Sequence, residues 1–430
     1  MGLCLPSGRY RPDGGGVTVS ANPIRAYAAV TAAYWAFMLT DGALRMLVLL
    51  QFNGLGFSPV ALAWLFLLYE IAGIATNLGA GWLAARFGLA ATLYGGLGLQ
   101  VAALVALAQL DPSWSIPASV AFVMAVQGVS GVAKDLAKMS SKSAVKLLAP
   151  SADGGLFRWV AALTGSKNAV KGLGFFLGAA LLALVGFKPA IWGMAGLLAL
   201  ILIAVVAFLP KGLPGRMKSE DSWGGWRSKD PQVNRLSLAR MFLFGARDVW
   251  FVVGLPVYFQ AVLSDGTAEG RREAFFLTGG FMALWIIAYG AVQAFAPRLL
   301  GAKSQPEAAI TAKAITWAGY LVPIPFALSL AVLIAPAPAP WLTATLLIGL
   351  LTFGFVFAVN SSVHSYLILA FGDVRRITRD VGFYYMANAA GRLIGTLLSG
   401  LSYQIGGLPL CLATAGAMAA ASWIAARRLA

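Results

Sequence analysis

The sequence predicts an all-α polytopic membrane protein with twelve transmembrane helices in two pseudo-symmetric six-helix bundles. The first observation is composition: 59% of the 430 residues are hydrophobic, 11% are charged, and the mean hydropathy is +0.78. A soluble domain is closer to half apolar. Twelve spans of about 20 residues need roughly 240 apolar positions, and this chain has enough hydrophobic residues to fill them. The second observation is the recurrence of apolar runs of helix length, and the third is one long polar stretch near the middle.

Each predicted span is an apolar run of about 20 residues or more, the length at which a helix crosses the hydrocarbon core of a bilayer. In chain order the spans are 26–52, 59–84, 89–110, 114–137, 160–185, 189–209, 236–262, 274–298, 308–334, 341–368, 381–404 and 408–426. The polar stretch after the sixth span carries six basic and three acidic residues with glycine and proline breakers. We therefore predict a disordered cytoplasmic tail over 1–25, an N-terminal bundle over 26–209, a cytoplasmic linker over 210–235 and a C-terminal bundle over 236–430.

The basic residues predict the orientation of the chain in the membrane. With the N-terminus inside, 22 of the 32 lysines and arginines fall in inner tails and loops, and three (Lys188, Arg271 and Arg272) fall in outer loops. Cytoplasmic loops carry such an excess as a rule. We therefore expect a multi-pass protein of the cell (inner) membrane with both termini in the cytoplasm. The net charge of +16 is then mostly an orientation signal, and we expect no nucleic-acid partner.

Several classes of site lack the residues they need. The two cysteines, Cys4 and Cys411, cannot form a disulfide framework. One histidine excludes metal motifs that need two, and neither a phosphate-binding loop nor a nucleophile elbow is present. We expect no enzymatic activity, no cofactor and no metal site.

Eight charged residues carry the functional prediction, because counting from the span ends places them at mid-depth or about one turn away. They are Asp41, Arg45, Glu70, Lys167, Lys171, Arg247, Asp248 and Arg392. A charge at the bilayer centre is costly, so it faces a partner or a watery cavity. Five cations stand against three carboxylates, which favours an anionic substrate such as a phosphate or carboxylate. We predict that the five cations bind substrate, together with Asn168 and Asn388.

The three carboxylates each have two interpretations. Asp41 and Arg45 are four residues apart and share a helix face. They form either an internal ion pair or a substrate arginine beside a proton-linked carboxylate. Glu70 is either a charge partner for Arg45 or Lys171, or a proton-carrying site. Arg247 and Asp248 point about 100° apart on a helix, so we expect that they do not simply pair with each other and that Arg45 and Arg247 can hold one anion from opposite halves.

A weak internal repeat relates the fifth and eleventh spans. Asn168-Ala169-Val170-Lys171-Gly172 and Asn388-Ala389-Ala390-Gly391-Arg392 align after one insertion, which superposes Lys171 on Arg392. Duplicated six-helix halves are typical of secondary transporters, whose substrate site lies at the midplane between the halves.

Two further groups are expected to be structural. Lys134, Lys138, Lys142 and Lys146 recur at every fourth residue, which predicts an amphipathic segment on anionic headgroups. Only Lys134 is near enough to the membrane to be considered for the cavity. His364 is expected to lie in a satisfied polar cluster with Asn360, Ser361 and Ser362.

The segment Gly81-Trp82-Leu83-Ala84-Ala85-Arg86-Phe87-Gly88 resembles the signature that follows helix 2 in the major facilitator superfamily, G-x-L-A-D-R-x-G. Gly81, Arg86 and Gly88 match this gating motif. Ala85 stands where the family has an aspartate, which puts the ion-pair latch attributed to the motif in doubt. The resemblance implies the major facilitator fold.

Longer strings resemble the organoarsenical efflux permeases of arsenic-resistance operons, the ArsJ type. They include TDGALRMLVLL from Thr40, GFSPVALAWLFLLYEIAGI from Gly56, GVAKDLAKMSSKSAVKLL from Gly131, GGLFRWVAALTGSKNAVKGLGFF from Gly154, FLFGARDVWFVVG from Phe242 and GFYYMANAAGRLIGTLLSG from Gly382. The resemblance implies efflux of 1-arseno-3-phosphoglycerate, which a glyceraldehyde-3-phosphate dehydrogenase makes from arsenate, and hence arsenate resistance. A general organophosphate or organic-anion exchanger is the alternative carrier. A membrane anion receptor that transports nothing is the alternative of another class.

Overall fold

The computed structural model of the protein describes residues 23–148, 155–208, 228, 230–300, 306–335, 337–371 and 377–429. Within these ranges every regular element is a helix. Eleven segments are long and apolar enough to cross a membrane, and the last of them runs for 50 residues. At 1.5 Å per residue this segment is far longer than the roughly 30 Å of a hydrocarbon core. It breaks at Gly406 and Gly407, so it supplies two spans and the described chain supplies twelve. The predicted fold class is confirmed.

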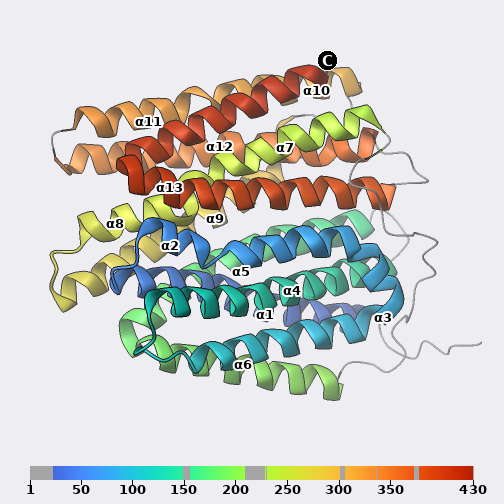
Figure 1. The fold of residues 1–430 in the computed structure, drawn as a ribbon. Helices are drawn as coiled ribbons and strands as arrows, with labels where there is room; N and C mark the ends of the chain where they lie inside the picture. Colours follow the sequence, from blue (N-terminus) through green and yellow to red (C-terminus); the bar gives the residue numbers. More distant parts are fainter. Residues whose placement is uncertain are drawn as a thin grey trace, which may run out of the picture.

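The N-terminal half contains the first six spans, and its helices lie together in Figure 1. Its helices are α1 (Pro23–Gly54), α2 (Pro59–Trp64), α3 (Leu67–Ala108), α4 (Ile116–Leu148), α5 (Gly155–Val185) and α6 (Phe187–Phe208). The second span begins where the Ser58 hydroxyl accepts the amide of Ala61 and Pro59 occupies the first turn. The second and third spans are joined within α3 at Gly88, whose φ of 75° is a left-handed conformation that glycine adopts without strain.

The C-terminal half contains the other six spans. Its helices are α7 (Pro231–Val249), the π-helix η1 (Trp250–Gly254), α8 (Leu255–Leu263), α9 (Ala268–Leu299), α10 (Glu307–Leu321), α11 (Pro323–Ile334), α12 (Pro340–Phe371), α13 (Ile377–Ala426) and the 3₁₀ turn η3 (Arg427–Leu429). Helix α7 begins earlier than predicted, because the Asp230 carboxylate caps the amide of Gln232 and Pro231 fits the first turn. Residues 231–235 therefore belong to the bundle. Most of the predicted linker, and the predicted tail as far as residue 22, lie outside the described residues.

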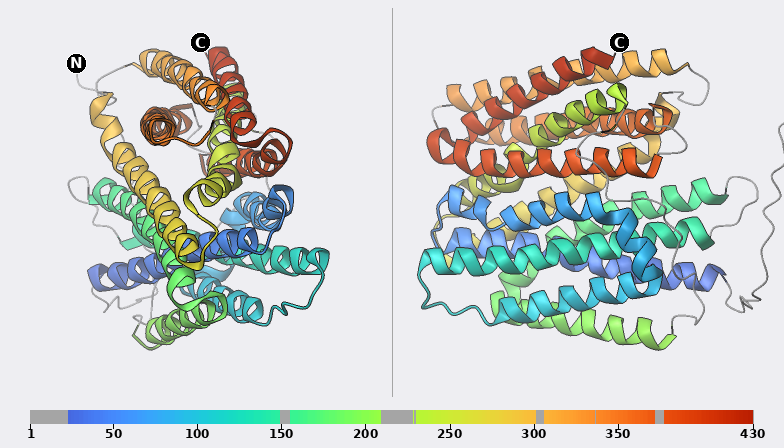
Figure 2. Two further views of the ribbon diagram at one scale, coloured as in Figure 1. Left: turned by 90° about the vertical axis from the view of Figure 1, so that its left-hand side faces the viewer. Right: turned by 45° about the vertical axis from the view of Figure 1, so that its right-hand side comes forward.

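The two halves lie side by side (Figure 2), with α5 packed against α9 and with α13 packed against α2 and α3. Met46, Leu50 and Phe175 of the N-terminal half join the apolar core of the C-terminal half. At the end of the bundle near α2, the Gln404 side chain accepts the amide of Val60 at 3.3 Å, and Gly400 lies against Pro59. The halves are therefore closely packed at this end of the molecule.

Glycines set the spacing of α1 and α5. A Cβ at Gly174 would meet the carbonyl oxygen of Leu39, and one at Gly178 would meet the carbonyl oxygen of Ala43. Small residues four apart allow this close backbone approach in membrane helices. The approach holds Lys171 of α5 beside Asp41 of α1, which is where the polar interior of the half begins.

Candidate functional site: a charged cavity between the halves

A cavity of about 270 Å³ lies between the two halves and is lined by residues from both. Ligand pockets span roughly 300–1,000 Å³, so this one suits a small molecule. The lining is unusually rich in charge for a membrane interior. Among the described residues it includes Arg45, Glu70, Lys134, Asp135, Lys138, Lys167, Lys171, Arg240, Arg247, Asp248 and Arg392. Seven of the eight charged residues selected from the sequence are in this lining, and Asp41 pairs with one of them.

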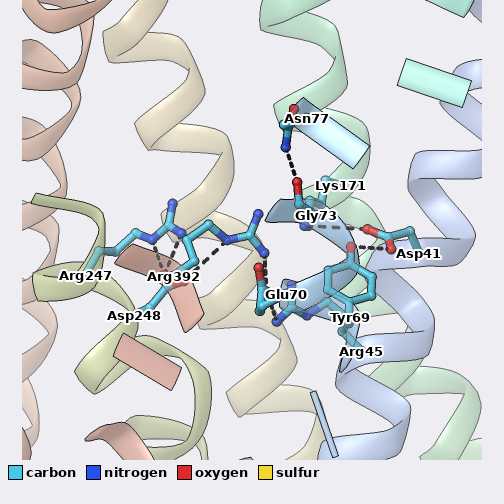
Figure 3. A network of polar contacts seen from close by, with 10 residues as sticks. All are labelled: Asp41, Arg45, Tyr69, Glu70, Gly73, Asn77, Lys171, Arg247, Asp248 and Arg392. Carbon is cyan, nitrogen blue, oxygen red and sulfur yellow. Dashed lines mark hydrogen bonds and ion pairs between the residues drawn. The ribbon is translucent and has the colours of Figure 1, made fainter. Parts of the chain in front are cut away.

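The two halves are joined across the cavity by an ion pair between Glu70 of α3 and Arg392 of α13 (Figure 3). The Arg392 guanidinium donates to the Glu70 carboxylate at 2.5 Å, and the Arg45 guanidinium contacts the same oxygen at 3.2 Å. The Glu70 side chain is 1% exposed. Of the two interpretations of Glu70, the structure contains the charge partner, and it adds a second arginine that the sequence did not indicate.

Each half contains a matching pair between its first and fifth spans. In the N-terminal half, Lys171 Nζ of α5 lies 3.6 Å from the carboxylate of Asp41 on α1. In the C-terminal half, Arg392 Nε of α13 lies 3.5 Å from the carboxylate of Asp248 on α7. Tyr69 adds a hydrogen bond of 2.7 Å to Asp41. The repeat that superposes Lys171 on Arg392 is therefore also a repeat of their contacts.

Arg247 and Asp248 correct the sequence prediction. The Arg247 guanidinium contacts the Asp248 carboxylate at 2.5 Å, although the two residues leave the helix about 100° apart. An arginine side chain is long enough to turn back around the helix toward its neighbour, so backbone direction alone does not exclude the pair. The Arg247 guanidinium also lies 4.9 Å from the ring centroid of Phe244, a distance suited to a cation–π contact. Arg45 and Arg247 both line the cavity from opposite halves, as expected.

A chain of hydrogen bonds that includes the Arg240 guanidinium connects the two predicted asparagines across the halves. Asn168 of α5 donates to Gln293 of α9 at 3.2 Å, and Gln293 donates to the Ser361 hydroxyl at 3.1 Å. Arg240 donates to Ser361 and also to Asn388. Both asparagines therefore lie in the cavity wall, and Asn388 positions an arginine.

Four charged residues of the lining were not among the predicted binding residues. Lys134, the one lysine of the stripe considered for the cavity, lines it, and Lys138 lines it too, which contradicts the headgroup prediction for Lys138. The side chains of Lys142 and Lys146 lie outside what the structure describes. Asp135 is 1% exposed and pairs with Lys138 at 2.9 Å. Arg240 is 4% exposed. An acid inside the lysine stripe, three residues before Lys138, was the signal that this helix face does not lie on anionic lipid.

The polar cluster around His364 and the gating motif are the two remaining features predicted from the sequence. His364 and Asn360 are fully buried, and neither His364 ring nitrogen has a hydrogen-bond partner among the described residues. The predicted satisfied cluster is therefore wrong for His364 and also for Asn360, whose side-chain nitrogen and oxygen have no partner in this part of the chain either. In the predicted gating motif, Gly88 makes the turn between two spans. The surroundings of Gly81 and the side chain of Arg86 are outside the described part of the chain.

The excess of cations over carboxylates is the same in the two halves. In the described N-terminal half, five lining cations (Arg45, Lys134, Lys138, Lys167 and Lys171) face three carboxylates (Asp41, Glu70 and Asp135). In the described C-terminal half, three lining cations (Arg240, Arg247 and Arg392) face one carboxylate (Asp248). Each half therefore contributes a surplus of two positive charges to one small cavity.

Comparison with known proteins gives a family and a fold. The family model of the Major Facilitator Superfamily matches residues 27–396. The nucleoside transporter NupG has a similar structure, with 16% sequence identity and a TM-score of 0.70, over 94% of this chain and 98% of that one. A structure of proton-dependent oligopeptide transporters, at 12% identity and a TM-score of 0.66, is similar over the same shares of the two chains. At these identities the likeness concerns the fold. No curated protein matches this chain.

Proposed function

Because this chain belongs to the major facilitator superfamily, whose members move substrates between two six-helix halves, we propose that it exports a small organic anion with two charged ends. The observation that carries this proposal is the surplus of two positive charges in each half, facing one cavity of about 270 Å³. A surplus of positive charge over carboxylates is costly in a membrane interior. A ligand with a dianionic group at each end would offset that cost.

The substrate that fits this distribution is 1-arseno-3-phosphoglycerate, which the resemblance to organoarsenical efflux permeases suggested. Its phosphate and arsenate ends can each carry two negative charges. Arginine forks and lysine ammonium groups both bind such oxyanions. In this proposal a glyceraldehyde-3-phosphate dehydrogenase supplies the adduct and export gives arsenate resistance.

Transport would proceed by rocking of the two halves around the cavity. Glu70 and Arg392 hold the halves together across the cavity. An oxyanion that enters would compete with Glu70 for the Arg392 guanidinium and would replace one direct contact between halves by a contact through the ligand. Export of an anion is aided by a membrane potential that is negative inside.

The test is arsenate tolerance of sensitive cells that express the chain with and without a matching dehydrogenase. We expect tolerance only when both are present, since the dehydrogenase makes the substrate. A Lys171→Ala variant that reaches the membrane should lose this tolerance, because Lys171 is the lining partner of Asp41. Tolerance that does not depend on the dehydrogenase would overturn the proposed substrate.

Vesicles containing the purified protein separate this proposal from a general exchanger. We expect uptake of the arsenate adduct to exceed uptake of 3-phosphoglycerate, which carries one negative charge fewer when both are fully ionised. Equal transport of the two would favour a general organophosphate carrier. Binding of either anion without any transport would favour a receptor.

The same proposal places the protein in the inner membrane with both termini in the cytoplasm. Lys188 is exposed at the start of α6, and Arg428 is exposed near the end of the chain. In a background without Cys4, we expect a membrane-impermeant maleimide to label Lys188→Cys in intact cells and to label Arg428→Cys only after the cells are opened. The opposite pattern would reverse the orientation.

A further inference from the structure

We infer that Lys134 and Arg240 are the residues that contact the two charged ends of the substrate, one in each half. This inference rests on the proposed function, since it assigns roles within the same cavity. Both residues line the cavity, and neither was selected as a binding residue from the sequence. They differ from Arg45, Lys138, Lys171, Arg247 and Arg392, which each contact a carboxylate, in that their own partners are neutral.

Most of the other cations are already neutralised by carboxylates. Arg45 and Arg392 share Glu70, Lys171 faces Asp41, Arg247 faces Asp248, and Lys138 faces Asp135. A paired cation must exchange its carboxylate for the ligand, so much of the attraction is lost. Among the described residues, Lys134 and Arg240 have no carboxylate within 4.0 Å of their charged nitrogens.

Lys134 is supported by an aromatic ring. Its Nζ lies 4.0 Å from the ring centroid of Tyr69, and the Arg45 guanidinium lies 4.6 Å from the same centroid. A ring face stabilises a cation through its quadrupole without cancelling the charge. The Tyr69 hydroxyl is fixed by its bond to Asp41. Lys134 is 9% exposed. Little water therefore screens its charge from an anion that enters the cavity.

Gly73 leaves the space beside the Lys134 amine. A Cβ at Gly73 would lie 3.8 Å from each of three atoms: Lys134 Nζ, Asp135 Oδ2, and the Cβ of Ala389, which belongs to α13 of the other half. The Asp135 carboxylate is already held by Lys138. The Lys134 amine is therefore at the boundary between the halves, and Gly73 is part of the cavity lining. An oxyanion bound there would be in reach of both halves.

Arg240 is the counterpart in the C-terminal half. Its Nε donates to Asn388 at 3.2 Å, and its Nη1 donates to the backbone oxygen and the hydroxyl of Ser361 at 2.9 and 3.2 Å. All three acceptors are neutral, so they orient the guanidinium and leave its charge uncompensated. Its Nη2 makes no hydrogen bond within the described part of the chain. The ring of Phe244 lies 4.2 Å from Arg240 Cζ, as the Tyr69 ring does for Lys134.

The test measures binding of inorganic phosphate and of 3-phosphoglycerate to the purified full-length protein by calorimetry. We expect Lys134→Gln and Arg240→Gln each to weaken binding of 3-phosphoglycerate at least tenfold. The double variant should lose the product of the two factors, because the residues contact different ends and act independently. Lys134→Arg and Arg240→Lys, which keep the charge, should recover most of the affinity. Lys188→Gln, which removes an exposed charge outside the cavity, should bind as the wild type does.

Thermal stability distinguishes binding from a structural role. A buried cation without a carboxylate partner destabilises the protein, so Lys134→Gln should melt at the same or a higher temperature than the wild type. A lower melting temperature together with lost binding would make Lys134 structural and would overturn its assignment. Unchanged affinity in both glutamine variants would overturn the assignment of both residues. Wild-type protein that binds neither anion would also overturn it. If phosphate binding follows this pattern while arsenate tolerance fails, the subsites stand and the proposed substrate falls.

Discussion

Replacing Arg392 by Gln is expected to abolish transport and to destabilise the protein by about 3–5 kcal/mol, the cost of removing one partner from a buried ion pair. Arg392 is the only described residue whose guanidinium contacts carboxylates of both halves, Glu70 at 2.5 Å and Asp248 at 3.5 Å. The substitution leaves Glu70 with Arg45 alone and removes the link between halves. Tolerance of arsenate in cells and melting of the purified protein in detergent would measure the two effects.

A variant that removes one charge of each sign separates the loss of transport from the loss of stability. In Glu70→Gln with Arg392→Gln both members of the bridge between the halves are neutral and the net charge is unchanged. We expect stability to recover only in part, because Arg45 loses its carboxylate partner, while transport stays absent. Arg392→Lys keeps the charge but cannot hold two carboxylates in a fork, and we expect partial transport. Normal transport by the Arg392→Gln protein would show that the bridge has no role in the cycle.

Replacing Gly178 by Val is expected to prevent the N-terminal half from packing correctly. A Cβ at Gly178 would collide with the backbone of Ala43, including its carbonyl oxygen, and backbone atoms cannot move aside as a flexible side chain can. Overpacking of this kind costs about 1–3 kcal/mol or more. Because α1 and α5 carry Asp41 and Lys171, their separation would also disrupt the cavity. The yield of monodisperse protein after extraction is the measurement.

The matched control is Gly193→Val in α6. This glycine is in the same half and is exposed, and a Cβ there would meet nothing within 4 Å. We expect normal yield and normal transport. Equal loss in the two variants would mean that valine disfavours the helices themselves and that close approach of α1 and α5 is not the cause.

The architecture was predictable because it follows from hydropathy. Long apolar runs and their polar breaks place all twelve spans, since the bilayer fixes the length that each run must have. The misplaced start of α7 has a local cause that hydropathy does not detect, because Asp230 with Pro231 extends this helix toward its N-terminus. The breaks at Gly88 and Gly406 lie between the predicted spans, where the sequence analysis expected them.

Most charged residues of the cavity lining could be selected from the sequence, but most of their partners could not. Arg45, Lys171 and Arg392 were found because a charge inside an apolar run is rare. The partner of each charge depends on side-chain reach and on how the helices are rotated, and neither can be read from spacing. Arg247 shows this, since it turns back to Asp248 against the expected direction. Lys138 shows it too, because its stripe has the spacing of a surface helix although Lys138 lines the cavity.

The π-helix at Trp250–Gly254 has a consequence for comparing this chain with other carriers. A π-turn holds one more residue than an α-turn, and each residue turns a helix by about 100°. Ser399 accepts the amides of Val253 and Gly254 there, which secures the wider turn. An alignment that passes through η1 without a gap would therefore match the cavity face before Trp250 correctly and assign the wrong face to every residue of α8. Such a comparison needs a one-residue gap inside η1, after Asp248 and before Leu255.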